Sequence, residues 1–186
     1  KNPDQASASL AKFSEILRHQ LYDSNDNLIS LSKEIQYLDN FIALEKLRQN
    51  EHLKLNVDLQ QHNLSGMEIA PFILMAFVEN AFKHVSRDVN KKNRIEICLN
   101  ITDRRLVFTV GNTVCETQTS VTGAPKGIGL PNVRRRLQLL YPGRHDLEIR
   151  STLERFDVKL ILYLPEVAVI NRAAPAMASS FEIITK

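Results

Sequence analysis

Four polar side chains stand together near the middle of the chain, in a segment that is otherwise apolar: Glu79, Asn80, Lys83 and His84. In a helix, Asn80 lies beside Lys83 and His84 on the next turn, and Glu79 also neighbours Lys83. Amide oxygens suit Mg²⁺, which takes hard oxygen ligands together with substrate phosphates, and a lysine one turn later can meet phosphate charge. The same residues also fit the solvated face of an amphipathic helix, so their spacing alone leaves both interpretations open.

A second pattern that could bind phosphate follows downstream, in Lys126-Gly127-Ile128-Gly129-Leu130. Its glycines stand between a long polar loop and the start of an apolar-periodic helix. Such a junction exposes backbone N–H groups at the positive end of a helix dipole, which together can hold phosphate. A lone Gly-x-Gly is also typical of a simple turn between a loop and a helix.

The elements before these motifs are predicted to be helical. Apolar residues recur every three or four positions over Leu10–Tyr22 and again over Ser32–Gln49, which indicates amphipathic helices. Ser30 or Ser32 can cap the second helix, whose charged residues, Glu34 among them, surround its apolar face. The pair is predicted to form an antiparallel hairpin, with an apolar stripe that a partner or the following domain must cover.

The remaining elements predict a mixed sheet with helices on one face, an α+β fold. Alternation of apolar and polar residues marks the strands, and a polar turn at residues 102–105 predicts a hairpin. The helix around Pro71 is expected to include this proline in its first turn. The predicted order is strand 53–59, helix 69–85, strands 94–101 and 106–110, loop 111–126, helix 127–141 ended by Pro142-Gly143, and strands 146–151 and 155–164.

Composition predicts a folded soluble domain. The chain has 186 residues, 44% of them hydrophobic and 24% charged, which suits one core with an appendage. The net charge of +3 is too small to imply a nucleic-acid partner. Cys98 and Cys115 fit a reducing compartment, and no apolar run reaches the ~18 residues of a membrane span, so a cytoplasmic location is expected.

Several motifs in order resemble the LytS-type sensor histidine kinases. The run Pro71–His84, with its Val-Glu-Asn-Ala-x-Lys-His core, resembles that family's asparagine box. The later Gly-Ile-Gly-Leu-x-Asn-Val-x-x-x-Leu resembles its second glycine box. Three upstream segments resemble the helices that precede the catalytic domain: Leu17-Arg18-His19-Gln20-Leu21, Leu31-Ser32-Lys33-Glu34-Ile35 and Leu44-Glu45-Lys46-Leu47-Arg48. The resemblance covers roughly residues 10–166.

The resemblance implies a Bergerat (GHKL) ATP-binding fold, a two-layer α/β sandwich preceded by the helical hairpin. It divides the chain into the C-terminal part of a helical dimerisation region (1–50), an ATP-binding catalytic domain (51–166) and a tail of unknown role (167–186). ATP and Mg²⁺ are the implied cofactors.

Roles for individual residues also follow from the resemblance. Asn80 would bind Mg²⁺, Lys83 and His84 would face the phosphates, and Glu79 would position water or assist the acceptor imidazole. Gly127, Gly129 and Leu130 would contact nucleotide at the hinge of a lid, Thr113–Lys126, that closes over ATP.

One residue departs from the family pattern at the position that reads adenine. The family has an aspartate followed by glycines at the end of the strand before the lid, where this chain has Asn112-Thr113-Val114. An amide oxygen can accept the same hydrogen bond from the adenine amino group, but it lacks the charge that strengthens it, which predicts a lower ATP affinity.

No histidine in the sequence is expected to be the phosphoacceptor or a metal ligand in a zinc site. No His-Phe-Leu-Phe-Asn type motif is present, and His19 matches a later part of the helical region, so it is expected to be an ordinary surface or interface residue. His52, His62 and His145 lie at the edges of different segments without a cluster at metal-ligand spacing, so no zinc site is predicted.

The leading hypothesis is therefore a protein histidine kinase fragment that binds Mg-ATP and, in a parent homodimer, phosphorylates a histidine outside this sequence. The fragment alone is expected to be inactive. The parent, expected to be anchored in the inner membrane, would pass the phosphoryl group to the receiver domain of a response regulator. The alternatives are an interaction module that dimerises and binds nucleotide weakly through a degenerate pocket, motivated by Asn112, and a non-kinase ATPase of the same fold.

Overall fold

The computed structural model describes residues 27–48, 52–59, 64–86, 88, 92–114 and 129–164, together with residues 11 and 14. Most of the predicted helix Leu10–Tyr22 lies outside the described residues, as do the lid beyond Val114 and the tail. Gly127, His19, His62 and Cys115 also lie outside them.

A five-stranded sheet forms one layer of the fold, with strand order β2-β4-β5-β7-β6. Its strands are β2 (Leu53–Leu59), β4 (Asn93–Thr102), β5 (Arg105–Thr113), β6 (His145–Ser151) and β7 (Arg155–Tyr163). β2 pairs with β4 in parallel, whereas the β4–β5, β5–β7 and β6–β7 pairs are antiparallel. The sheet is therefore mixed, as predicted.

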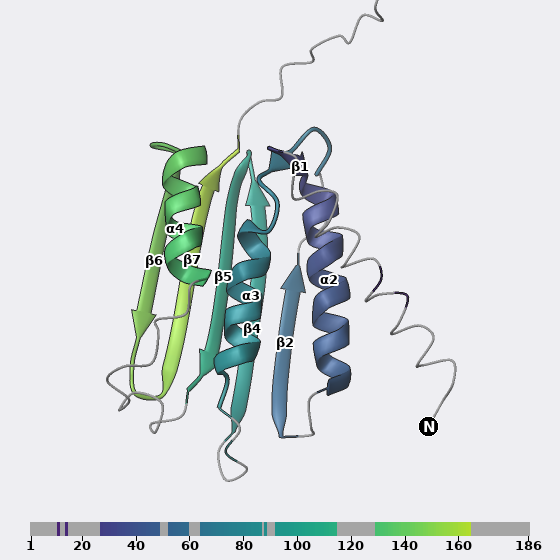
Figure 1. Cartoon of the computed structure of the whole chain (residues 1–186), viewed down its shortest axis with the longest axis vertical. Helices are drawn as coiled ribbons and strands as arrows, with labels where there is room; N and C mark the ends of the chain where they lie inside the picture. The colour runs from purple at the N-terminus through teal and green to yellow at the C-terminus, as the bar shows by residue number, and fades with distance from the viewer. Residues whose placement is uncertain are drawn as a thin grey trace, which may run out of the picture.

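The second layer consists of helices that cover one face of the sheet (Figure 1). They are α2 (Leu31–Arg48), α3 (Ile73–His84) and α4 (Gly129–Leu140). α3 contacts β4 and β5, and it also contacts both α2 and α4, while α4 reaches β6. The predicted two-layer α+β architecture is confirmed, and the other face of the sheet carries no described helix.

The core lies between the two layers, because each strand turns alternate side chains toward the helices. In β4, Ile95, Ile97 and Leu99 are buried, whereas Glu96 and Cys98 point to the open face. β5 and β7 follow the same rule from Leu106 to Asn112 and from Val158 to Leu162. This alternation decides which face of the sheet each predicted site residue can reach.

Helix α2 begins and ends within one residue of the prediction Ser32–Gln49. Its start is capped by Ser30, whose Oγ accepts a hydrogen bond from the Lys33 backbone N–H at 3.3 Å. The apolar stripe of α2 is covered by α3, where Phe82 packs edge-on against Phe41 with ring centroids 5.9 Å apart. The following domain thus supplies the cover that this stripe was predicted to need.

The predicted start of the next helix, at Ile69, is wrong. Glu68–Ile69 is instead a short strand, β3, which pairs antiparallel with β1 (Ile29–Ser30). Pro71 lies before α3 rather than in its first turn, and Phe72 adopts a left-handed conformation (φ 61°) at the N-cap. This distant pairing with β1 leaves no periodic signal in the local sequence.

The predicted turns are confirmed. Asp103 and Arg104 have φ values of 47° and 62°, the left-handed pair that lets a two-residue turn match the twist of β4 and β5. Gly143, with φ 67°, follows α4 and lets the chain reverse into β6. None of the helices among the described residues is long and apolar enough to cross a membrane.

Candidate functional site

The four polar residues first singled out all lie in the second half of α3. Glu79 and Lys83 are exposed, whereas Asn80 and His84 are half-buried. Because Asn80 and His84 are four residues apart, they share one flank of the helix. That flank is turned away from Phe82, which contacts α2, and so it faces the side of α3 on which α4 packs.

The protonation of two of these residues is shifted by their surroundings. Partial burial raises the pKa of Glu79, although its side chain still reaches solvent. Desolvation lowers the pKa of His84, and the neighbouring Lys83 ammonium lowers it further. At neutral pH the free protein therefore presents a neutral imidazole beside an ammonium group.

Asn112 lies near the end of β5 with its side chain on the helix-covered face of the sheet, in line with Phe108 and Val110. It is 1% exposed, and its Nδ2 donates a 3.1 Å hydrogen bond to the Thr113 carbonyl oxygen. Its Oδ1 has no hydrogen-bond partner among the described residues. A buried oxygen without a donor is costly, and an amino group of a ligand would satisfy it.

Helix α4 runs antiparallel to α3. Near its end, the Tyr141 hydroxyl oxygen accepts a 2.7 Å hydrogen bond from the Ala70 N–H, and Arg136 Nη2 donates a 2.8 Å bond to the Pro71 carbonyl oxygen. The end of α4 therefore lies beside the beginning of α3. It follows that Gly129, where α4 starts, lies toward the end of α3 that carries His84.

The end of α3 is also joined to the end of β5, because the Ser86 N–H donates a 2.8 Å hydrogen bond to the Thr113 carbonyl oxygen. Asn80, His84, Asn112 and Gly129 are thus brought toward one end of the molecule, the lower end in Figure 1. Three elements that are distant in sequence supply them. Glu79 and Lys83 adjoin this group from the solvent side of α3.

The glycine motif is described only in part. Gly129 is the first residue of α4, and no described atom lies within 4 Å of a Cβ built on it, so nearby packing does not require glycine there. Leu130 is half-buried and packs against the core. Gly127 lies outside the described residues.

One residue that sequence reasoning misplaced is Glu34, which was expected among the solvated charges of α2. It is fully buried, and its two carboxylate oxygens accept hydrogen bonds from the Phe72 and Leu74 N–H groups, each at 3.1 Å. The signal was its position: Glu34 falls on the apolar stripe between Leu31 and Leu38. A carboxylate on such a stripe indicates a buried partner.

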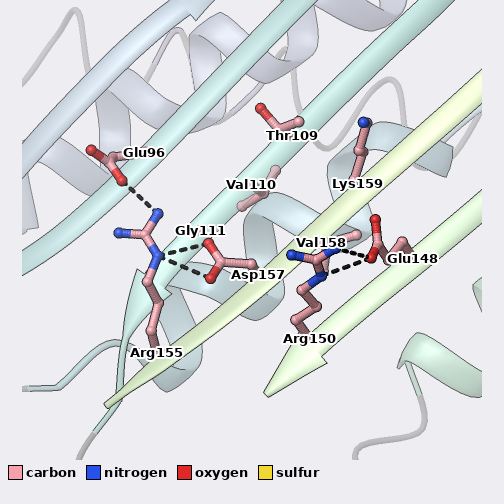
Figure 2. A pocket seen from close by; sticks show the side chains of 10 residues that line it. All are labelled: Glu96, Thr109, Val110, Gly111, Glu148, Arg150, Arg155, Asp157, Val158 and Lys159. Atoms are coloured by element: carbon pink, nitrogen blue, oxygen red, sulfur yellow. Dashed lines mark hydrogen bonds and ion pairs between the residues drawn. The ribbon is translucent and has the colours of Figure 1, made fainter. Parts of the chain in front are cut away.

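The open face of the sheet carries a separate charged network (Figure 2). Arg155 bonds Asp157 through Nε at 2.7 Å and Glu96 through Nη2 at 2.5 Å. These side chains cross β5 at Gly111, where an added Cβ would collide with both Arg155 and Asp157. The Arg155 hydrogen bond, partly opposed by desolvation, lowers the pKa of Glu96.

This network borders a hollow of about 360 Å³ on the open face, away from the helix-covered face that Asn112 reaches. A smaller hollow of about 190 Å³ lies on the outer side of α3, where Glu79 is its polar member. Of the predicted site residues that the structure describes, only Glu79 lines either hollow. No cluster of His, Cys, Asp or Glu able to hold a metal ion occurs within the described part of the chain, which includes His52 and His145.

Known proteins match both the sequence and the fold. A family model described as histidine kinase matches residues 1–53. LytS sensor protein from Streptococcus mutans serotype c is 30% identical over 161 residues, covering 80% of this chain and 27% of that protein. LytS from Staphylococcus haemolyticus is 27% identical over 159 residues, with the same coverage, and the sensor histidine kinase BtsS of Escherichia coli K12 is 24% identical over 165.

Among solved structures, the histidine kinase domain of the Erythrobacter litoralis EL346 blue-light activated kinase superposes with a TM-score of 0.50 at 15% identity, covering 87% of this chain and 80% of that one. This likeness concerns the fold alone. The sequence matches make the chain a homologue of the LytS sensor histidine kinases, and the solved structure shows the same fold. The chain spans about a quarter of the length of the LytS proteins it matches, 27% in each case cited above.

Proposed function

We propose that the chain is the ATP-binding catalytic part of a sensor histidine kinase and that it binds Mg-ATP where α3, β5 and α4 converge. The observation that carries this proposal is the buried Oδ1 of Asn112, which has no hydrogen-bond partner among the described residues and lies at the same end of the fold as the half-buried Asn80 and His84. An adenine amino group can donate a hydrogen bond to that oxygen, while the polar side chains of Asn80 and His84 on the neighbouring flank of α3 meet the phosphates.

Each site residue has a role in this proposal. Asn80 offers an amide oxygen to Mg²⁺, and bound Mg²⁺ supplies charge neutralisation for the phosphates. Lys83 and His84 contribute donors to phosphate oxygens from the end of α3, and Gly129 and Leu130 line the phosphate side at the start of α4. Gly127, which lies outside the described residues, is proposed to contact phosphate as well. The exposed ammonium of Lys83 can swing toward bound phosphate.

Glu79 is proposed to act on the acceptor rather than on the nucleotide. It lies on the outer side of α3, and partial burial raises its pKa, which makes it a better proton acceptor than a fully solvated carboxylate. From there it can accept a hydrogen bond from one ring nitrogen of an incoming histidine. The opposite nitrogen is then held free of a proton and can attack the γ-phosphorus, so that the new N–P bond forms as the bond to the β–γ bridging oxygen breaks and ADP leaves.

The activity of the whole sensor follows as a proposal from its relatives. The γ-phosphoryl group passes to a histidine of the sensor and then to an aspartate in a response regulator receiver domain. The sensor is proposed to act as a homodimer anchored in the inner membrane, with residues 1–50 continuing its helical dimerisation region and 51–166 forming the cytoplasmic catalytic domain. Positioning and charge neutralisation are the main sources of catalysis.

Calorimetric titration with a non-hydrolysable ATP analogue tests the binding proposal. The expected result is magnesium-dependent binding that is lost in Asn80→Ala, while Asn100→Ala, an exposed amide on β4, binds like the wild type. Absence of binding at millimolar nucleotide would favour the alternative of an interaction module with a degenerate pocket. Asn112, which replaces the family's aspartate, is the observation that keeps this alternative in view.

A further inference from the structure

The start of α3 is capped from another helix. Glu34 of α2 receives the N–H groups of Phe72 and Leu74 on its two carboxylate oxygens, and the carboxylate is fully buried. The first N–H groups of a helix have no partner within the helix, and its N-terminus carries positive charge. A buried carboxylate satisfies both requirements at once.

The local sequence of α3 supplies no cap of its own. Phe72 stands at the N-cap without a side-chain hydrogen bond, in a left-handed conformation, and the first turn contains no acidic residue. Left-handed backbone is costly for an aromatic residue and persists only where the surroundings impose it. The Glu34 contacts therefore hold the beginning of α3 in a conformation that its own residues do not favour.

The segment before α3 is tied to α4 and β1 as well. The Tyr141 hydroxyl oxygen accepts from the Ala70 N–H, Arg136 donates to the Pro71 carbonyl oxygen, and Ile69 pairs with Ile29 of β1, just before α2. Successive backbone groups of this segment are thus fixed by the elements on either side of α3. Its position depends on α2 through Glu34 and β1, and on α4 through Tyr141 and Arg136.

We propose that Glu34 is a positioning residue for the nucleotide site, coupling α2 to the end of α3 that carries Asn80 and His84. This inference rests on the proposed function. An α-helix rises about 1.5 Å per residue, so Asn80 lies about 9 Å and His84 about 15 Å along the axis from Leu74. A helix transmits an axial shift at its start to these residues, and a displacement of α2 therefore reaches the nucleotide through Glu34.

The test compares Glu34→Gln with Leu38→Ala in the full 186-residue chain. Glutamine keeps the size of the side chain but replaces one acceptor oxygen with an NH2 group, which donates and cannot accept. Leu38 lies on the same stripe of α2 and is fully buried, so its truncation lowers stability without touching the cap. The affinity for a Mg-ATP analogue is measured by calorimetry at a temperature well below the Tm of both variants. Backbone amide chemical shifts are recorded by NMR without nucleotide.

We expect Glu34→Gln to weaken Mg-ATP analogue binding at least about fivefold, within the usual range for coupling between sites, and to shift the Asn80 and His84 amide resonances. We expect Leu38→Ala to change affinity less than about twofold, because it loses packing but keeps the coupling contact. Glu34→Gln with wild-type affinity and unshifted Asn80 and His84 amides would overturn the inference. An equal loss of affinity in Leu38→Ala would overturn it too, since the effect would then follow stability alone.

The amide shifts separate this inference from the proposed function. If the wild-type chain binds no nucleotide, the proposed function fails, but the nucleotide-free spectra still decide whether Glu34 controls the position of Asn80 and His84. Shifts at both residues in Glu34→Gln alone would then support the coupling, and their absence would reject it.

Discussion

Replacing Tyr141 by phenylalanine removes a single hydroxyl group that holds the start of α3. Tyr141 is 1% exposed, and its oxygen is the acceptor for the N–H of Ala70, which is 0% exposed. The aromatic ring remains in Tyr141→Phe, so little packing is lost. The cost is therefore that of leaving a buried backbone N–H without a partner, about 1–3 kcal/mol.

The expected magnitude can be read from unfolding experiments. For a chain of this size, 1 kcal/mol shifts Tm by about 2–4 °C, so a central loss of about 2 kcal/mol lowers Tm by about 4–8 °C. Urea unfolding followed by far-UV circular dichroism should give a lower midpoint with an unchanged slope. A difference below about 0.3 kcal/mol would refute the assignment of this hydrogen bond, since it would fall well short of the cost of an unpaired N–H.

The same substitution predicts a pH dependence. Burial raises the pKa of Tyr141, with the Ala70 hydrogen bond acting in the opposite direction. Because its folded-state pKa is raised, the neutral hydroxyl adds to the free energy of unfolding. This stabilisation is fully present below the ordinary tyrosine pKa, about 10, and is lost as pH rises through the folded-state pKa. The stability gap between wild type and Tyr141→Phe should therefore narrow above about pH 10. A gap that stays constant from pH 8 to about 11 would contradict this reasoning.

Three further predictions concern other parts of the molecule. Asn112→Asp should strengthen Mg-ATP binding about fivefold through a charged acceptor, and should lower the nucleotide-free Tm because the carboxylate is buried; calorimetry and thermal unfolding measure the two effects. The pKa of Glu96 is lowered mainly by its hydrogen bond from Arg155. The ionised carboxylate therefore adds to the free energy of unfolding above the ordinary pKa of 4.5, and this stabilisation is lost as pH falls through the folded-state pKa. The gap in unfolding free energy between wild type and Glu96→Gln, measured by urea unfolding, should be below about 1 kcal/mol at pH 7 because the pair is partly exposed, and should shrink as pH falls below 4.5. Desolvation lowers the pKa of His84, and the charge of Lys83 lowers it further, whereas bound phosphate favours the protonated imidazole. Nucleotide affinity should therefore rise as pH falls from 8 to about 6 in wild type but not in His84→Gln.

The sequence predicted the elements whose signals are local. The alternation in β2 and β4, the apolar spacing of α2 and the polar turn between β4 and β5 each lie within a short window, and each element appears where it was expected. The site motif on α3 was placed correctly on a helix for the same reason. Its partner, Asn112, was found through the family pattern and lies on the face of the sheet that the helices cover.

The features that the sequence did not predict depend on contacts between distant residues. Strands β1 and β3 are two residues each and gain their structure only by pairing across 40 positions, Ile29 with Ile69. Glu34 counts as a surface charge until the N-terminus of α3 is placed beside it. Gly111 has no local turn to explain it, because its small size serves the Arg155 and Asp157 side chains on the neighbouring strand.

Whether the ends of α3, β5 and α4 form one nucleotide site is tested most directly by amide chemical shifts of the labelled chain during titration with a magnesium-bound, non-hydrolysable ATP analogue. Binding at this site should give saturable shifts at Asn80, His84, Thr113 and Leu130, with little change at Cys98, Lys159 and Tyr163 on the open face of the sheet. Shifts confined to the open face, or none at millimolar analogue, would contradict it.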